Sequence, residues 1–500
     1  MPEQALGAWH PKWPSMNLRS KCWQFLRLTV LCAADEELAV SALDALALRM
    51  VGCLFMVSAI PFFSISLLRR AALAASVFLL PLVDCRDVVY RESNAAATTN
   101  TSTSGETARS AYDFINSIGL NTHLNYFDRI YGNFPLVQRE LKSIGVRHVR
   151  DGVHLQNADY NAALYDRWIQ LGKMGVRFNA VLDPRSNLGS LNGALLDEVE
   201  SLSGQTIESF EGPNEMDVSN ESDWTAVDQG YQGLIFTSDR SMNGTHPKVI
   251  GPSLAFASNG TELGSLTNRI DEGNLHPYPA GKAPSVVFPE QVDLEKVVSD
   301  GKPIVFTESG YHNAVNERHD QPGVSESAAA KYVPRLFLED FSRGIPRTYL
   351  YEFMDEAPEP AMTDPQMHWG LIRADGSEKP AFTSLKNMIQ VLEDSTEESS
   401  PQQLGWKLSD ANDQIHHVLL QKSDGTFYLV LWQETSSYDL RHNADIDNAD
   451  VAETLTLTRT ARSVSVYEPM EGTAAVHSWD SVSSVPISIP DHPLIVEIGF

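Results

Sequence analysis

The chain has 500 residues, of which 42% are hydrophobic and 21% are charged, and its formal net charge is −27. Because hydrophobic cores stop growing beyond about 250–300 residues, this length predicts more than one domain. A surface with this excess of negative charge repels nucleic acids and anionic membranes, so neither is an expected partner. All four cysteines lie within the first 85 residues, which excludes a disulfide framework or a cysteine metal site in the remainder.

Residues 1–97 are predicted to be an N-terminal extension, followed by a linker at 98–114. Two arginines, Arg69 and Arg70, precede an apolar run without charges, which is the pattern of a secretory signal. A further apolar run at 51–68 leaves a retained membrane anchor open, and we expect contact with a membrane only in that case. A secreted or periplasmic protein is therefore expected, with anchoring, or neither of these, as the alternatives.

From about residue 115, short apolar runs alternate with amphipathic stretches. Strand-like runs occur at 118–124, 145–152, 175–184, 207–215, 248–254, 274–279, 302–310 and 347–356. The intervening "FPLVQRELKSI" at 134–144 has apolar residues spaced near 3.6, which predicts a helix. Strands that alternate with helices imply parallel pairing, and eight such units predict a (β/α)8 TIM barrel over 115–394. An open doubly wound sheet is the alternative, but the first strand run lacks the glycine-rich turn typical of such sheets.

The pattern changes after the barrel. A polar, Ser- and Glu-rich stretch at 395–403 is predicted to be a second linker. Beyond it the periodicity is two, and the run at 416–434 predicts a hairpin that turns at "SDGT". The same alternation continues to residue 500, so 404–500 is predicted to be an antiparallel β-sandwich domain beside the barrel.

Two of the predicted strand ends carry a glutamate. Glu215 closes "SFEGPNE" on the fourth strand, and Glu308 lies in "VFTES" on the seventh. In a barrel of this kind, function lies at the C-terminal ends of the strands. Cleavage of a glycosidic bond needs a protonated acid and an ionised carboxylate that attacks the anomeric carbon or activates water. Either glutamate alone would read as a surface residue, but the pair on one rim predicts a catalytic site.

Other polar and aromatic residues fall at or near the same rim. An arginine or amide there could hold a carboxylate or a sugar hydroxyl, and aromatic rings offer faces on which sugars stack. The residues predicted to bind substrate are Arg150, Asn214, His276, Tyr278, Tyr351 and Trp369.

Gly-Pro-Asn-Glu at the fourth strand and Thr-Glu at the seventh resemble clan A of the retaining glycoside hydrolases, notably the cellulase-like family 5 and family 39. Arg150 and the "HPY" of His276–Tyr278 also resemble that clan's pattern. The resemblance extends over roughly residues 115–390. It implies a general acid/base at Glu215 and a nucleophile at Glu308.

The resemblance also implies roles for the neighbouring residues. Asn214 would bind the 2-hydroxyl group, Arg150 would keep the nucleophile ionised, and Tyr278 and His276 would position the two carboxylates. One departure concerns the sugar platform, because many members of the clan carry a tryptophan at the end of strand eight. This chain has Tyr351 there, and Trp369 a little downstream would take that place.

The sequence thus predicts a retaining O-glycosyl hydrolase that acts on a β-linked oligo- or polysaccharide, with carbohydrate as its partner and without a cofactor or a metal. The alternatives are a non-catalytic carbohydrate-binding protein on the same barrel and a transglycosylase. A barrel acting on phosphate esters or aldols is disfavoured, because no phosphate-binding glycine loop and no lysine closes a strand. The sequence makes no prediction of oligomeric state.

Overall fold

The computed structural model describes residues 101–500, apart from 187, 189, 289, 318–320, 398–399 and 411. All of these described residues belong to one compact unit, Ser93–Phe500. Within it, none of the described helices is both long and apolar enough to cross a membrane. The predicted signal and anchor segments lie outside the described residues, so export remains a prediction that N-terminal sequencing of the mature protein tests.

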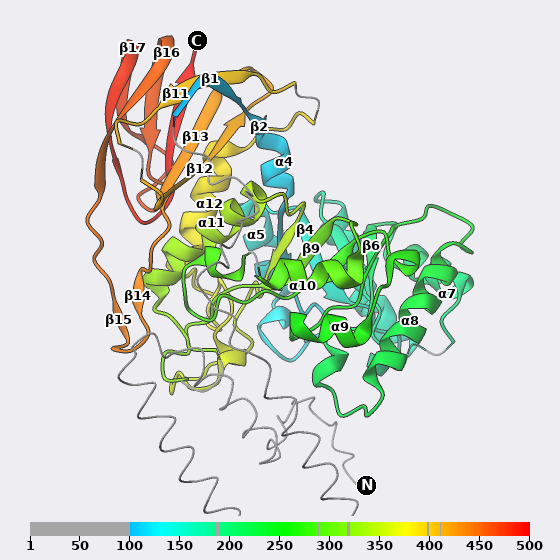
Figure 1. The fold of residues 1–500 in the computed structure, drawn as a ribbon. Helices are drawn as coiled ribbons and strands as arrows, with labels where there is room; N and C mark the ends of the chain where they lie inside the picture. Colours follow the sequence, from blue (N-terminus) through cyan, green and yellow to red (C-terminus); the bar gives the residue numbers. More distant parts are fainter. Residues whose placement is uncertain are drawn as a thin grey trace, which may run out of the picture. The chain divides into compact units, whose positions relative to one another are not determined.

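The first region is a barrel of eight parallel strands (Figure 1). The strands are β3 (Ile118–Asn121), β4 (His148–Gly152), β5 (Arg177–Val181), β6 (Ile207–Glu211), β7 (Lys248–Ile250), β8 (Gly273–Leu275), β9 (Ile304–Ser309) and β10 (Thr348–Leu350). β10 pairs with both β3 and β9, and a bridge between Ile250 and Glu272 joins β7 to the start of β8. The predicted (β/α)8 barrel is confirmed, and each strand overlaps a run that the sequence predicted, although β8 begins one residue before its run.

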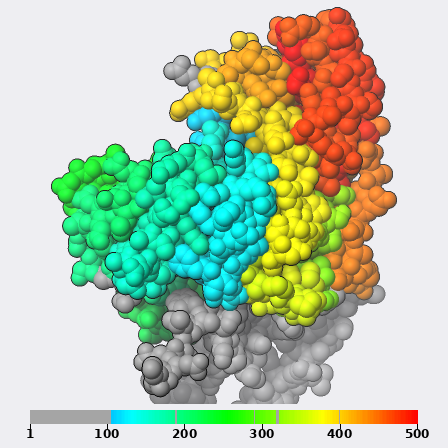
Figure 2. Space-filling view, turned by 180° about the vertical axis from the view of Figure 1, so that it is seen from behind, coloured from blue at the N-terminus to red at the C-terminus, as the bar shows by residue number. Residues whose placement is uncertain are grey.

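Helices cover the outside of the barrel. They are α5 (Phe134–Ile144), α6 (Ala158–Gly172), α7 (Gly193–Leu202), α8 (Trp224–Asp239), α9 (Gly260–Leu263), α10 (Glu290–Ser299), α11 (Glu326–Ser342) and α12 (Pro380–Leu392). α5 has the predicted bounds and ends at Gly145, whose φ of 81° is in the left-handed region that favours glycine. α5 contacts α12, so the first and last helices of the barrel lie side by side, as the cyan and yellow surfaces of Figure 2 show.

The second region is a mostly antiparallel β-sheet of eight strands. Its strands are β1 (Thr101–Thr107), β2 (Arg109–Ser110), β11 (Gln403–Lys407), β12 (Ile415–Gln421), β13 (Phe427–Gln433), β16 (Val451–Tyr467), β17 (Ala475–Ile489) and β18 (Leu494–Gly499). A separate small hairpin consists of β14 (Tyr438–Asp439) and β15 (Ala444–Asp445). β12 and β13 form the predicted hairpin. β16 pairs with β11 in its first half and with β18 in its second, so one long strand serves both parts of the sheet.

Both faces of β13 are buried, and this joins the two regions. Tyr428, Val430 and Trp432 belong to the core that includes the barrel helices. The alternate residues Leu429 and Leu431 belong to a second core, which lies within the sheet region. Because successive side chains of a strand point to opposite faces, one strand seals the sheet against the barrel and also fills the sheet's own interior.

The linker predicted at 98–114 is wrong from residue 101 onward, where the described residues begin. β1 pairs antiparallel with β11, β2 pairs parallel with β12, and α4 (Ala111–Asn116) follows directly. The Ser- and Thr-rich sequence reads as a linker because it lacks apolar alternation. Its strand conformation depends on backbone hydrogen bonds to β11 and β12, which follow the barrel in the sequence.

Candidate active site

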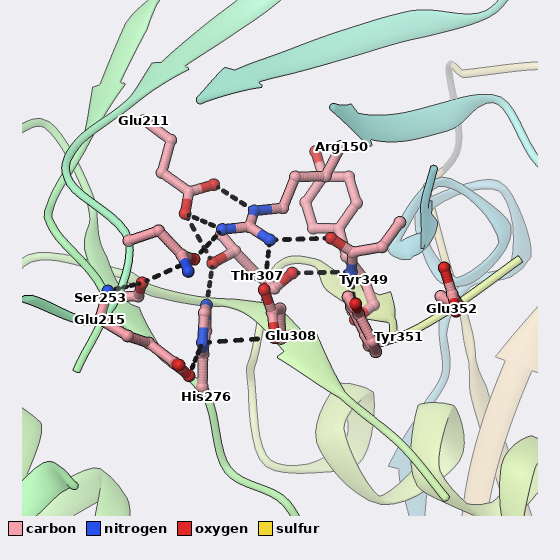
Figure 3. Close-up of polar contacts among 12 residues, drawn as sticks. Arg150, Glu211, Glu215, Ser253, His276, Thr307, Glu308, Tyr349, Tyr351 and Glu352 are labelled. Atoms are coloured by element: carbon pink, nitrogen blue, oxygen red, sulfur yellow. Dashed lines mark hydrogen bonds and ion pairs between the residues drawn. The ribbon is translucent and has the colours of Figure 1, made fainter. Parts of the chain in front are cut away.

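The two predicted carboxylates meet at the C-terminal rim of the barrel (Figure 3). Glu308 is in β9, and Glu215 lies four residues beyond the end of β6. One carboxylate oxygen of each lies within 4.8 Å of the other and of a nitrogen of His276. The side chain of Glu215 is 27% exposed and that of Glu308 is 11% exposed, so both are open to a small molecule at the rim.

Arg150 uses all five of its N–H groups within the barrel. Nη1 donates to Glu308 Oε1 at 2.6 Å and to Asn121 Oδ1 at 2.9 Å. Nη2 donates to Asn214 Oδ1 at 2.6 Å, and Nε and Nη2 each donate to Glu211 at 2.8 Å. Burial alone would lower the pKa of Arg150, but the two carboxylates outweigh it and the pKa is raised. The guanidinium is therefore a fixed positive charge beside Glu308.

Glu308 is held as a carboxylate from several sides. Tyr278 donates its hydroxyl to Oε2 at 2.7 Å, and His276 Nδ1 lies 3.6 Å from the same oxygen. Burial favours the neutral acid, but the charges of His276 and Arg150, with the bonds from Tyr278 and Arg150, outweigh it and lower the pKa of Glu308. An ionised carboxylate with its charge directed at the rim is the form that a nucleophile needs.

His276 connects the two carboxylates. Its Nδ1 lies 2.8 Å from Glu215 Oε1, and its Nε2 lies 2.9 Å from Thr307 Oγ1. Its side chain is fully buried. Burial alone would lower the pKa of the imidazole, but Glu308 and Glu215 outweigh it and the pKa of His276 is raised.

Hydrogen bonds to the N–H and carbonyl groups of Asn214 and to the N–H of Glu215 hold the backbone that carries Glu215. Asp183 Oδ2 accepts a hydrogen bond from Asn214 N at 3.2 Å, and Arg185 donates to the Asn214 carbonyl. On the other side Glu215 N donates to the Ser253 carbonyl at 3.1 Å. Glu215 has φ 48° and ψ 53°, in the left-handed region that residues other than glycine rarely adopt. Such a conformation persists only where neighbouring groups fix it, and these contacts do so.

The aromatic residues predicted at the rim cluster around Trp369. Its ring centroid lies 5.0 Å from that of Tyr278, 5.8 Å from that of Tyr351 and 4.7 Å from that of His312. Trp369 is only 7% exposed, so most of its ring packs against these neighbours. Tyr351 is more open, and its hydroxyl lies 3.3 Å from His123 Nε2. The structure thus packs Tyr351 and Tyr278 against Trp369, with the Tyr278 hydroxyl on Glu308, and leaves Tyr351 as the more accessible ring of Tyr351 and Trp369.

Sequence reasoning missed a polar layer beneath the rim. Its centre is Glu211, a fully buried carboxylate that binds Arg150 through both oxygens. The other members, each from a different strand, are Asn121, Asn179, Asn274 and Thr307. A signal was present, because Asn121, Arg150 and Asn179 occupy matching positions on consecutive strands. Such a row points into the barrel together.

Groups of one histidine and two carboxylates that could hold a metal occur at three places among the described residues: Glu215/His276/Glu308, His123/Glu352/Glu356 and Glu339/His416/Glu434. In the first, Arg150 and Tyr278 already donate to Glu308, so hydrogen-bond donors take the place of a cation. In the third, Arg335 forms an ion pair with Glu434 at 2.7 Å. A guanidinium beside a carboxylate disfavours a metal ion there.

No family model and no curated protein matches the sequence. Solved structures do match the fold. The GH39 enzyme from Xanthomonas axonopodis pv. citri is 12% identical with a TM-score of 0.52, over 82% of this chain and 99% of its own. A glucosidase from Croceicoccus marinus is 11% identical with a TM-score of 0.53, and a monomeric beta-xylosidase from Caulobacter crescentus CB15 is 13% identical with a TM-score of 0.51. Each of these two matches covers 79% of this chain and 97% of the other.

These identities are low, so the similarity concerns the fold. The matches cover about four fifths of the 500 residues, which is more than the barrel alone. The resemblance to family 39 and its clan, which the sequence motifs indicated, is therefore confirmed at the level of architecture. The roles of the individual site residues remain predictions.

Proposed function

We propose that the protein is a retaining glycoside hydrolase that cleaves a β-linked oligo- or polysaccharide by double displacement. The observation that carries this proposal is the Glu215–Glu308 pair, whose nearest oxygens lie within 4.8 Å. Retaining enzymes hold their carboxyl groups about 5–5.5 Å apart, whereas inverting enzymes leave about 6.5–9.5 Å for a water molecule. The short separation supports direct attack by one of the two carboxylates.

Glu308 is the proposed nucleophile because it is the carboxylate that positive charge and hydrogen bonds keep ionised. Arg150 occupies one of its oxygens and Tyr278 the other, so the orientation of the carboxylate is fixed before substrate binds. In the first step a Glu308 oxygen forms a bond to the anomeric carbon while the bond to the leaving oxygen breaks. Glu215 donates its proton to that leaving oxygen.

In the second step water takes the place of the departed group. The oxygen of this water attacks the anomeric carbon, and the ester bond to Glu308 breaks. Glu215, now a carboxylate, accepts a proton from the attacking water. Asn214 already uses its side-chain oxygen to accept from Arg150 and Ser253, so its amide NH2 is the group that would bind the sugar's 2-hydroxyl. Tyr351 and Trp369 would contact the sugar ring.

The test measures hydrolysis by the full chain on aryl β-glycosides and on β-linked glycans. Xylosides and glucosides come first, because similar solved structures include a beta-xylosidase and a glucosidase. We expect release of sugar with the β configuration kept, seen by proton NMR in the first minutes of reaction. Azide should restore activity on aryl glycosides to Glu308→Gly, because it replaces the lost nucleophile. Sugar of the inverted configuration, or a glycan that binds without being cleaved, would contradict the proposal.

A further inference from the structure

The hydrogen bonds around His276 determine whether its Nε2 carries a proton. Thr307 Oγ1, its partner at 2.9 Å, also lies 2.7 Å from Asn274 Oδ1 and 3.0 Å from Glu211 Oε1. Both of those oxygens are acceptors. A hydroxyl has one hydrogen to donate, so Thr307 gives it to one of the two and has none for the imidazole.

The orientation of the Asn274 amide is fixed by its own partners. Its Nδ2 donates to Glu211 Oε1 and to the Gly251 carbonyl, each at 3.1 Å. Oδ1 is therefore the atom that faces Thr307, and it can only accept. It follows that His276 Nε2 carries a proton and donates it to Thr307.

Nδ1, the other nitrogen of His276, faces two carboxylates. Glu215 Oε1 lies at 2.8 Å and Glu308 Oε2 at 3.6 Å. Among the described residues, the other charged groups near the ring are Arg150 and, beyond Thr307, Glu211, and the Tyr278 hydroxyl is turned to Glu308. A bare carboxylate and a bare nitrogen would repel each other at 2.8 Å, so one proton lies between Nδ1 and Glu215. Two carboxylates on a fully buried nitrogen favour that proton on the imidazole.

We propose that His276 is the proton store of the acid/base: the proton that Glu215 gives to the leaving group rests on His276 Nδ1, as an imidazolium, until substrate binds. This inference depends on the proposed glycosidase function for its chemical step, but the charge state of His276 in the free protein does not. Because His276 acts through Glu215, it is a positioning and proton-holding residue rather than a group that touches substrate.

The proton and the charges balance through the cycle. When Glu308 bonds to the anomeric carbon, Glu215 protonates the leaving oxygen, and the pair is left as a carboxylate and an imidazole protonated at Nε2 alone. At the same moment Glu308 becomes an uncharged ester, so the second charge that favoured the imidazolium disappears. Attack by water then returns a proton to Glu215, frees Glu308 as a carboxylate and restores the imidazolium.

Nitrogen-15 NMR of the histidine-labelled full chain distinguishes the imidazolium from each neutral tautomer. The signal of His276 is the one absent from the His276→Gln variant. We expect His276 to stay doubly protonated at a pH where the exposed histidines have become neutral, and to leave its proton at Nε2 when it does titrate. A neutral His276 at that pH, or a proton on Nδ1 alone at any pH, would overturn the proposal.

Two variants test the causes. Glu308→Gln removes the carboxylate charge at 3.6 Å, so the midpoint of the His276 titration should move to lower pH. Thr307→Val removes the acceptor for Nε2–H, whereas Thr307→Ser keeps it, so only the valine variant should lose the preference for Nε2. A His276 titration that neither Glu308→Gln nor Thr307→Val alters would overturn the assignment.

The kinetic test compares leaving groups in His276→Gln. A dinitrophenyl group leaves without a proton, and a poor leaving group such as methylphenyl needs one. We expect kcat/KM to fall by about 10² or more for the poor leaving group and by less than about tenfold for the good one. An equal fall for both would mean a purely structural role. If no glycoside reacts with the wild type, the function fails while the NMR result still decides the state of His276.

Discussion

Two buried clusters of this molecule have nearly the same composition and different consequences. The barrel cluster lies inside the strands, and the interface cluster lies between α11 and the sheet region. Each combines an arginine and two glutamates with a histidine: Arg150, Glu211, Glu308 and His276 in the barrel cluster, and Arg335, Glu339, Glu434 and His416 in the interface cluster.

The clusters differ in what their carboxylates face. Arg335 is fully buried and bonds Glu434, a serine hydroxyl and the backbone carbonyls of Thr435 and Asp491. Trp432 Nε1 donates to both Glu339 and Glu434, so protein groups surround this network. In the barrel cluster all partners of Arg150 are side chains, and Glu308 reaches the rim. Residue types alone therefore do not distinguish the two clusters, whereas the barrel cluster, which is the proposed site, has a charged oxygen that is fixed and yet open to the rim.

The largest difference between the clusters should appear on neutralising one glutamate in each. Glu308→Gln should lower kcat/KM by about 10⁴-fold or more, because the proposed nucleophile is lost, with little change in thermal stability. Glu434→Gln should leave the activity of the folded protein unchanged and lower its melting temperature. Activity on an aryl glycoside and calorimetry on both variants measure this contrast. Equal losses of activity would mean that the clusters are not functionally distinct.

Arg335→Met should destabilise the protein by about 3–5 kcal/mol, because it leaves Glu434 buried without its cation. Chemical denaturation measures this free energy of unfolding. The double variant Arg335→Met/Glu434→Gln should recover part of the loss, since no unpaired charge remains. Activity per folded molecule should stay the same in both, and a fall in kcat would contradict a purely structural interface cluster.

Glu211→Gln should lower kcat/KM by about 10²-fold, although Glu211 has no exposed surface and cannot touch substrate. The carboxylate holds Arg150 through both oxygens, so its loss lets the guanidinium shift relative to Glu308. The matched control is Glu208→Gln on the same strand, whose carboxylate bonds His148 instead. If Glu211→Gln is as active as the control, the layer beneath the rim does not position Glu308 for the proposed reaction.

Tyr278→Phe should lower kcat/KM by about tenfold and change its pH dependence. The Tyr278 hydroxyl is one of the groups that lower the pKa of Glu308, so removing it raises that pKa. Glu308 must be ionised to react, and the acidic limb of the pH profile therefore moves to higher pH. Tyr311→Phe serves as control, because its hydroxyl bonds the Lys282 carbonyl. An acidic limb that stays in place would show that the Tyr278 hydroxyl does not lower the pKa of Glu308.

The last contrast concerns a buried carboxyl group that has neither an arginine nor a histidine partner among the described residues. Burial raises the pKa of Glu295 well above its usual range. The folded state thus keeps a proton that the unfolded chain releases above about pH 4.3, so this stabilisation is complete below that pH and is lost as pH rises, by at most about 1.4 kcal/mol per pH unit. Residue 295 does not titrate in the Glu295→Gln variant. From pH 4 to 7 the free energy of unfolding of this variant should therefore rise relative to that of the wild type. Glu290→Gln, exposed on the same helix, should show no such gain.

Much of the barrel was predictable because its signals are local. Most strands overlap a short run rich in apolar residues, and α5 shows its buried face through the spacing of Leu136, Val137, Leu141 and Ile144. β1 was not predictable in this way. Its residues are mostly small and polar, and only the pairing with β11 makes them a strand.

The same distinction between local and long-range signals applies to the residues of the candidate site. Glu215 and Glu308 were predictable because each follows an apolar run at a rim position. Glu211 was not, because a glutamate inside a strand run reads as a residue of the exposed face. Only the closed barrel turns that face inward, where Arg150 and Asn274 surround it. The packing of Trp369 against Tyr278 likewise depends on how two distant loops meet.

The pairing of β1 with β11 has a consequence for biosynthesis. Thr107 and Gln403, which are register partners, are separated by 296 positions in the chain. A ribosome adds about 5–20 residues per second, so β1 leaves it about 15–60 s before its partner exists. The whole barrel is made during that interval, and a Ser- and Thr-rich first strand, with little apolar surface to attract other chains, suits a segment that must wait.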